Sequence, residues 1–214
     1  MEGSEDIKGK RTALAIKLVV AFHLIGLAGL LITPTRPLFL QLVPYHLLLM
    51  TLVLFFTHQP FNKKFTSFFL LIFIVGFTVE WIGVHTGKLF GSYNYGPTLG
   101  LQLGGIPVIM GANWFLLIYA AGVSLQYLSI KAIWLRILIG AIILVLLDLL
   151  IEPVAIRLNY WHWVGNTIPF TNYSCWFIIS VVLLLVFELL RFKKQSIVAV
   201  ILLVSQFIFF AALQ

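Results

Sequence analysis

Long apolar segments separated by short polar ones constrain this chain more than any other feature. A helix needs about 20 consecutive apolar residues to cross the hydrocarbon core of a membrane. Seven segments approach or reach that length, and they cover residues 13–33, 38–57, 65–85, 106–127, 134–156, 174–191 and 196–213. The sequence therefore predicts an all-α, polytopic membrane protein of about seven transmembrane helices, with residues 1–214 forming a single transmembrane domain.

The composition supports lipid as the solvent of the outer surface. Hydrophobic residues make up 61% of the chain and charged residues 10%, against about 25% charged in soluble domains. A soluble protein with so much exposed apolar surface would aggregate. The net charge of +7 does not indicate a nucleic-acid partner, because the basic residues lie in short clusters between apolar segments rather than on one basic face.

The basic residues also predict the orientation, because cytoplasmic loops of membrane proteins carry an excess of Lys and Arg. Of the 14 Lys and Arg residues, eleven fall on the N-terminal side of the predicted bundle: Lys8, Lys10, Arg11, Lys17, Lys63, Lys64, Lys131, Arg136, Arg191, Lys193 and Lys194. The opposite side has three: Arg36, Lys88 and Arg157. We expect a cytoplasmic N-terminus and a C-terminus on the outer side.

Three carboxyl side chains, Glu80, Asp148 and Glu152, lie within predicted transmembrane segments. Charged side chains are costly there, so they usually face the protein interior and serve function. At about 1.5 Å per residue, Glu80 lies roughly 22 Å and Asp148 roughly 21 Å from the cytoplasmic ends of their segments. Glu152 lies one turn further, on the helix face of Asp148. All three carboxyls should therefore meet at one level, toward the outer side.

Such a cluster is suited to acid–base chemistry. Three carboxyls in a low-dielectric pocket cannot all be ionised, so a protonated acid is expected beside ionised neighbours. The alternative is that they pair with Arg157, Lys88 or backbone amides and only fix the packing of the helices. The five histidines lack metal-binding spacing, and the chain has no phosphate-binding or dinucleotide-binding motif. We expect no metal and no cofactor.

Two predicted loops on the outer side, residues 86–105 and 157–173, are long and rich in Gly, Asn, Tyr and Trp. Irregular backbone at a membrane is tolerated where it lines a cavity, so these loops are candidate lids over the carboxyls. Aromatic faces stabilise cations, although such residues also form interfacial belts. The aromatic residues at this level are Trp81, Tyr93, Tyr95, Trp114, Tyr160, Trp161 and Trp163.

A faint internal repeat links two parts of the chain. The first part contains Glu80, Ile106-Pro107 and Asn113-Trp114; the second contains Glu152, Ile168-Pro169, Asn172 and Trp176. Both parts begin in a segment that runs outward, so the repeat would be a parallel one. The intervals between these residues differ, and the sequence alone gives a duplication only weak support.

Two stretches carry a resemblance to a known family. EWIGVHTGKLFGSYNYGPTLGLQLGGIPVIMGANW (80–114) contains the pattern ExxG…G…FG.Y.Y, and DLLIEPVAIRLNYWHW (148–163) is followed by IPFTNYSCW (168–176). They resemble the carotenoid hydratases, which include the bisanhydrobacterioruberin hydratases of haloarchaea and bacterial carotenoid 1,2-hydratases. The resemblance covers most of residues 76–178, which we expect to be the active-site core.

The resemblance implies that water is added across the terminal C1–C2 double bond of a linear carotenoid, such as lycopene, γ-carotene or a longer homologue. Glu80 or Asp148 would be the acid, Glu152 or the other carboxyl would orient water, and Asn113, Asn159 and Asn172 would be polar contacts to the substrate. Membrane lipid is the other expected partner, and a prokaryotic inner membrane the expected location. Two alternatives stay open: a membrane lycopene cyclase that starts with the same protonation, and a transporter or pigment-binding protein without chemistry.

Overall fold

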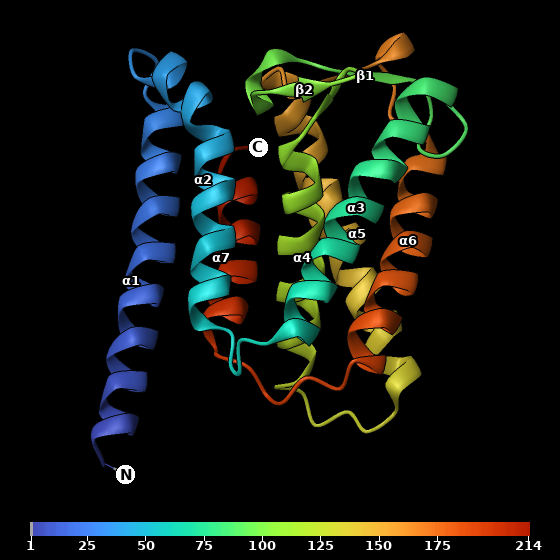
Figure 1. The fold of residues 1–214 in the computed structure, drawn as a ribbon. Helices are drawn as coiled ribbons and strands as arrows, with labels where there is room; N and C mark the ends of the chain where they lie inside the picture. The colour runs from blue at the N-terminus through green and yellow to red at the C-terminus, as the bar shows by residue number, and fades with distance from the viewer. Residues whose placement is uncertain (1) are drawn as a thin grey trace.

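The computed structural model describes the backbone of residues 2–214 and the side chains of residues 9–214. Each of the seven predicted segments contains one helix (Figure 1). The helices are α1 (Glu2–Leu31), α2 (Arg36–Thr57), α3 (Lys63–Thr86), α4 (Ile109–Leu125), α5 (Ile133–Arg157), α6 (Phe170–Leu189) and α7 (Val198–Ala212). The predicted all-α architecture is therefore present, with small strands added at one end.

Five of the helices, α1, α2, α3, α5 and α6, are long and apolar enough to cross a membrane. The apolar helices α4 and α7 are shorter, with 17 and 15 residues, or roughly 26 Å and 22 Å against a hydrocarbon core of about 30 Å. Large apolar side chains such as Leu24, Ile74 and Ile178 are exposed on the outer faces of the long helices. This is the architecture of an integral membrane protein.

Helix α4 lies at the centre of the bundle and is buried along most of its length. It packs against α2 and α7 on one side and against α3, α5 and α6 on the other, while α1 packs on α2 and α7. The bundle thus has two parts, α1–α2–α7 and α3–α5–α6, with α4 between them (Figure 1).

Local signals in the sequence define helix α3, which carries one of the carboxyls. The side chain of Asn62 accepts a hydrogen bond from the backbone N–H of Phe65 at the start of the helix, as N-cap residues do. Gly87 ends the helix in the left-handed conformation, with φ 64°, which glycine adopts without steric cost. The chain is therefore turned sharply just after the helical turn that contains Glu80.

The loops after α3 and α5 contain short strands. Strands β1 (Tyr93–Tyr95) and β4 (Trp161–Trp163) form an antiparallel pair, in which Tyr93 lies opposite Trp163 and Tyr95 opposite Trp161. Strands β2 (Gln102–Leu103) and β3 (Ile106–Pro107) pair within the first loop. Single 3₁₀ turns at Pro97–Leu99 and Val164–Asn166 complete the loops.

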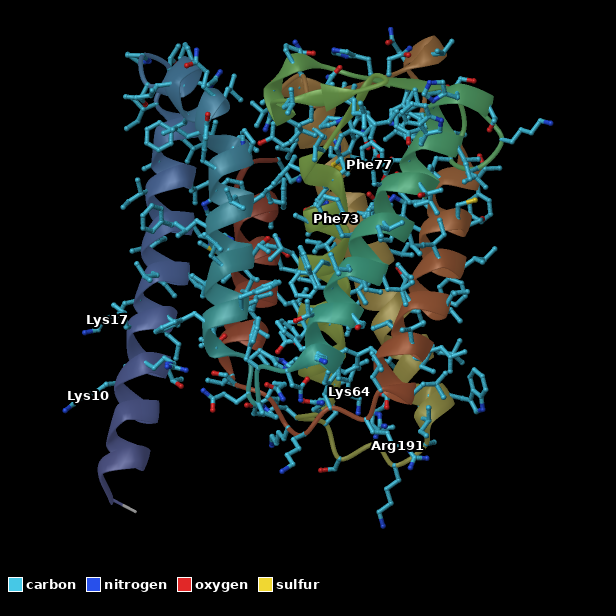
Figure 2. All side chains as sticks on the ribbon, in the orientation of Figure 1. Lys10, Lys17, Lys64, Phe73, Phe77 and Arg191 are labelled. Atoms are coloured by element: carbon cyan, nitrogen blue, oxygen red, sulfur yellow. The ribbon has the colours of Figure 1, made fainter. Side chains whose placement is uncertain are left out.

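The basic residues gather at the end of the bundle away from β1 and β4. Figure 2 shows Lys10, Lys64 and Arg191 toward this end, while the strands cover the other. An ion pair between Arg136 and Glu188 joins α5 to α6 there. The side chain of Lys8, which the charge count includes, lies outside the described residues.

Candidate active site

The three carboxyls lie together beneath β1 and β4. Glu80 comes from the last two turns of α3, and Asp148 and Glu152 come from the C-terminal half of α5. All three are at least 96% buried. Arg157 does not neutralise them, because its guanidinium donates to the carbonyl oxygens of Leu213 and Gln214.

Glu80 accepts hydrogen bonds on both of its oxygens. The hydroxyls of Tyr93 and Tyr95 donate to Oε2 over 2.5 Å and 2.7 Å. The indole N–H of Trp114 donates to Oε1 over 2.8 Å. Three neutral donors, two from β1 and one from α4, therefore hold this carboxyl.

Glu152 is held in a similar way by the other half of the site. The indole N–H groups of Trp161 and Trp163 donate to its Oε2 over 3.0 Å and 2.7 Å. The amide of Asn172 donates to its Oε1 over 3.2 Å and also to Oδ2 of Asp148 over 2.9 Å. The other oxygen of Asp148, Oδ1, is buried and has no hydrogen-bond partner among the described residues.

The alternation of side chains along a strand explains how two loops hold two carboxyls. Residues i and i+2 of a strand point to the same face, so Tyr93 and Tyr95 point inward from β1, and Trp161 and Trp163 point inward from β4. The residues between them, Asn94 and His162, are exposed. The local patterns Tyr-Asn-Tyr and Trp-His-Trp thus each place two donors over one carboxyl.

The two halves of the site are related by an approximate two-fold arrangement. Each half has a helix that runs toward β1 and β4 and carries a glutamate, a strand that donates two hydrogen bonds to this glutamate, and an Ile-Pro pair with a tryptophan seven residues after the proline. These tryptophans, Trp114 and Trp176, stack on each other with ring centroids 4.4 Å apart and planes 21° apart. The two parts of the faint repeat in the sequence therefore have matching elements on the two sides of the site.

The halves differ at two corresponding positions. Asp148 precedes Glu152 by four residues, and the residue four before Glu80 is Gly76. A Cβ atom added at Gly76 would lie 2.5 Å from Cβ of Trp114, so the first half has no room for a second carboxyl. Asn172, three residues after its Ile-Pro proline, corresponds to Met110 in the first half. Only the second half therefore has the Asp–Asn–Glu hydrogen-bond network.

A small cavity lined by two of the carboxyls and a large apolar cavity adjoin the site. The small one, of about 20 Å³, is lined by Glu80, Phe90, Tyr93, Tyr95, Met110, Glu152, Trp161, Trp163, Asn172 and Trp176. The large one, of about 340 Å³, lies between α1, α2 and α7 on one side and α4 and α5 on the other. Met110 and Trp161 line both cavities, so they form the wall between them.

Three of the predicted contact residues lie elsewhere. Trp81 points to the outer surface of α3, where it stacks on His85. Asn159 lies in the turn after α5 with φ 59° and contacts His162. Asn113 lines the large cavity and not the small one.

Sequence reasoning missed two residues that line the small cavity, Met110 and Phe90, and did not assign Trp176 to the site. The equal Ile-Pro to Trp spacing in the two halves was the signal that pairs Trp176 with Trp114. Among residues 9–214, no group of three His, Cys, Asp or Glu side chains could hold a metal ion. Burial, and next the charge of Glu80, raise the pKa of Tyr93 far above its usual value, which keeps this hydroxyl protonated as a donor.

Comparison with known proteins places this site in a biosynthetic context. Residues 42–214 match the profile of a family described as carotenoid biosynthesis protein. The bisanhydrobacterioruberin hydratase of Haloarcula japonica is 26% identical over 122 residues, which cover 54% of this chain and 42% of that relative. The chain thus matches less than half of the relative's length, and no solved structure matches the chain significantly. Because the family profile covers most of the sequence, the family predicted from the sequence is confirmed, and the chain belongs to the carotenoid biosynthesis proteins.

Proposed function

We propose that the protein adds water across the terminal C1–C2 double bond of a linear carotenoid and forms a tertiary alcohol. The observation that carries this proposal is the small cavity, onto which Glu80 and Glu152 face, with Asp148 beside them. Its volume of about 20 Å³ is room for about one water molecule. The family supports a carotenoid as the substrate, with lycopene, γ-carotene or a longer homologue as candidates.

The proposed reaction is redox-neutral and needs no cofactor. An acid transfers its proton to C2, the π electrons form the new C–H bond, and a tertiary cation remains at C1. The oxygen of water then forms a bond to C1, and the proton that this oxygen loses goes to a carboxylate. One water is added in total.

Glu80 is the proposed acid. Its partners Tyr93 and Tyr95 carry hydroxyls, which can accept as well as donate hydrogen bonds, so the site can hold Glu80 both with and without its proton. After the proton has left, the same hydroxyls and the indole of Trp114 stabilise the carboxylate. Tyr93, Tyr95 and Trp114 are therefore positioning residues for the acid.

Glu152 is the proposed base that accepts the proton of the attacking water. Its partners Trp161, Trp163 and the amide nitrogen of Asn172 are donors only, which suits a carboxylate that is ionised before reaction. Asp148 shares the Asn172 amide with Glu152 and interacts electrostatically with both glutamates. We assign Asp148 to returning the proton from Glu152 to Glu80 after each turnover.

Aromatic rings enclose the place where the cation would form. Trp161, Trp163 and Trp176 line the small cavity together with Tyr93 and Tyr95. The faces of such rings attract cations by about 0.5–2 kcal/mol each. They would stabilise the charge at C1 without adding a nucleophile that competes with water.

We further infer that α1–α7 all cross the membrane, with the N-terminus in the cytoplasm and the site toward the outer side. The excess of basic residues at the end opposite to β1 and β4 supports this orientation. Helix α4 is buried along most of its length, and α7 packs against α1, α2, α4 and α5, so these two short helices need not match the full thickness of the bilayer. The polyene would enter sideways from the lipid.

The test is mass spectrometry of the pigments in lycopene-producing cells that express the protein. We expect new pigments heavier than lycopene by one or two waters, absent from cells that express Glu80→Gln. A new pigment of unchanged mass would indicate that the protein closes a ring rather than adding water. If lycopene co-purifies with the protein and stays unchanged, the protein binds the pigment without modifying it, and the proposal is overturned.

A further inference from the structure

The large cavity is well suited to an isoprenoid chain. Its volume of about 340 Å³ falls at the lower end of the range for ligand sites, about 300–1,000 Å³. Nearly all of its wall is apolar, with residues such as Phe22 and Gly26 of α1, Phe39 and Leu47 of α2 and Phe209 of α7. An unsaturated hydrocarbon chain can fill such a space without losing hydrogen bonds.

The wall between this cavity and the carboxyls has one fixed member and one flexible member. Trp161 is fixed, because its indole N–H is bonded to Glu152 and its ring packs edge-on against Tyr95 and Tyr160. The side chain of Met110 makes no hydrogen bond among the described residues, and an unbranched methionine has three rotatable bonds. A chain in the large cavity could therefore reach Glu80 by displacing Met110 alone.

The position of Met110 in the two-fold arrangement supports this role. At the corresponding place in the second half, Asn172 closes the site by bonding to two carboxyls. The first half has a flexible apolar side chain there instead. The site is thus closed by hydrogen bonds where Asn172 lies, and only by van der Waals contacts where Met110 lies.

One polar atom on the cavity wall is left unpaired by the described residues. The amide oxygen Oε1 of Gln206 is buried and has no hydrogen-bond partner among the described residues, although Gln206 lines the cavity. An unpaired buried acceptor costs about 1–3 kcal/mol. A water molecule, or a hydroxyl on a bound chain, would satisfy it.

We propose that the large cavity binds the acyclic isoprenoid end of the substrate, and that displacement of Met110 admits its terminal double bond to the carboxyls. This proposal rests on the proposed function and names where the substrate of that reaction is held.

The binding half of the proposal is tested by filling the cavity from Gly26. A Cβ atom at this position would meet only Phe209, at 3.6 Å, so Gly26→Leu fits the helix and places its side chain in the cavity. The matched control is Gly9→Leu, because a Cβ at Gly9 has nothing within 4 Å. The readout is lycopene retained by purified protein in lipid nanodiscs, with every variant made in the inactive Glu80→Gln background.

We expect the Gly9→Leu protein to retain lycopene like the background, and the Gly26→Leu protein to retain it about tenfold less, because the cavity is overpacked. Equal retention by the two variants would overturn the proposal. So would a background protein that retains phospholipid but no lycopene. Because the background is inactive, these results do not depend on whether water is added.

The gate half is tested with Met110→Phe in the active protein, with Leu24→Phe at an exposed position of α1 as the control. We expect Met110→Phe to retain lycopene but to lose at least about tenfold in conversion, and Leu24→Phe to convert it like wild type. Conversion by Met110→Phe equal to that of wild type would exclude the gate. If all the proteins, wild type included, retained lycopene without adding water, the proposed binding site would still be supported. The proposed hydratase activity would be excluded.

Discussion

Trp114 and Trp176 stack face to face at the centre of the site, with ring centroids 4.4 Å apart. They come from corresponding places in the two halves, but among the described residues only Trp114 of the two holds a carboxyl, through its hydrogen bond to Glu80. The stack therefore joins two similar units whose chemical parts have diverged. The first unit has an isolated glutamate with tyrosine partners, and the second has the Asp–Asn–Glu network.

Glu80→Gln should abolish turnover and leave the protein folded. Glutamine keeps the size of glutamate and an oxygen that accepts from Tyr93 and Tyr95, but it has no proton to give to carbon. We expect conversion of lycopene to fall at least about 100-fold, measured as hydrated pigment per mole of purified protein. The control is Glu188→Gln at the other end of the bundle, which should keep full activity. Full activity of Glu80→Gln would exclude the proposed role of Glu80 as the acid.

Asp148→Asn should separate the first turnover from later ones. If Asp148 returns the proton from Glu152 to Glu80, a protein purified with Glu80 protonated can still hydrate one substrate. We expect a rapid phase of at most one product per protein, followed by turnover at least about 100-fold slower than wild type. Rapid-mixing measurements with pigment analysis would reveal it. Sustained turnover at the wild-type rate would exclude the proton-return role.

The level of the three carboxyls could be predicted because helix rise converts residue numbers into depth. Glu80, Asp148 and Glu152 do lie together at one level, and their aromatic partners lie in the two loops singled out in the sequence. Trp81 shows that a residue next to a site residue in the sequence need not belong to the site. Consecutive residues of a helix point about 100° apart, so the neighbour of Glu80 faces outward, and the helical geometry alone could have excluded it.

The pairing of β1 with β4 and the large cavity could not be predicted. Tyr93–Tyr95 and Trp161–Trp163 are separated by more than 60 residues, and three-residue strands have too little periodicity to reveal a partner. The cavity has walls from α1, α2, α4, α5 and α7, and only their packing in three dimensions creates it. Sequence patterns report the faces of single helices, so a space enclosed by five of them leaves no local signal.

Trp114→Phe should reduce activity while keeping the stack on Trp176. Phenylalanine retains an aromatic face but lacks the N–H that donates to Glu80, and a hydrogen bond to a charged group contributes about 1.5–3 kcal/mol. We expect a loss of about 10- to 100-fold in conversion. Trp176→Phe is the matched variant, because the Trp176 indole makes no hydrogen bond among the described residues, and it should lose much less. Equal losses in the two variants would assign the effect to packing rather than to the hydrogen bond.

Tyr93 should make the folded protein sensitive to alkaline pH. Burial raises the pKa of Tyr93 in the folded state above the unfolded value of about 10. Its contribution to stability is therefore complete below about pH 10 and is lost as the pH rises further, because only the unfolded state readily releases the proton. We expect the thermal midpoint of Tyr93→Phe to fall less steeply above pH 10 than that of wild type. Tyr45→Phe, at an exposed position, should leave the slope unchanged, and an identical slope in Tyr93→Phe would contradict the prediction.

Gly76→Ala should destabilise the protein, although alanine is the better helix former. A Cβ at this position would lie 2.5 Å from Cβ of Trp114, so α3 and α4 would have to move apart. Overpacking of this kind costs about 1–3 kcal/mol, while the gain in helix propensity offsets about 1 kcal/mol. The net effect should lower the thermal midpoint and also the activity, because Trp114 would shift away from Glu80. Gly9→Ala gains the same propensity without a contact and should not lower the midpoint. If Gly76→Ala were as stable and active as Gly9→Ala, the close approach of α3 to α4 would not be needed to hold Glu80.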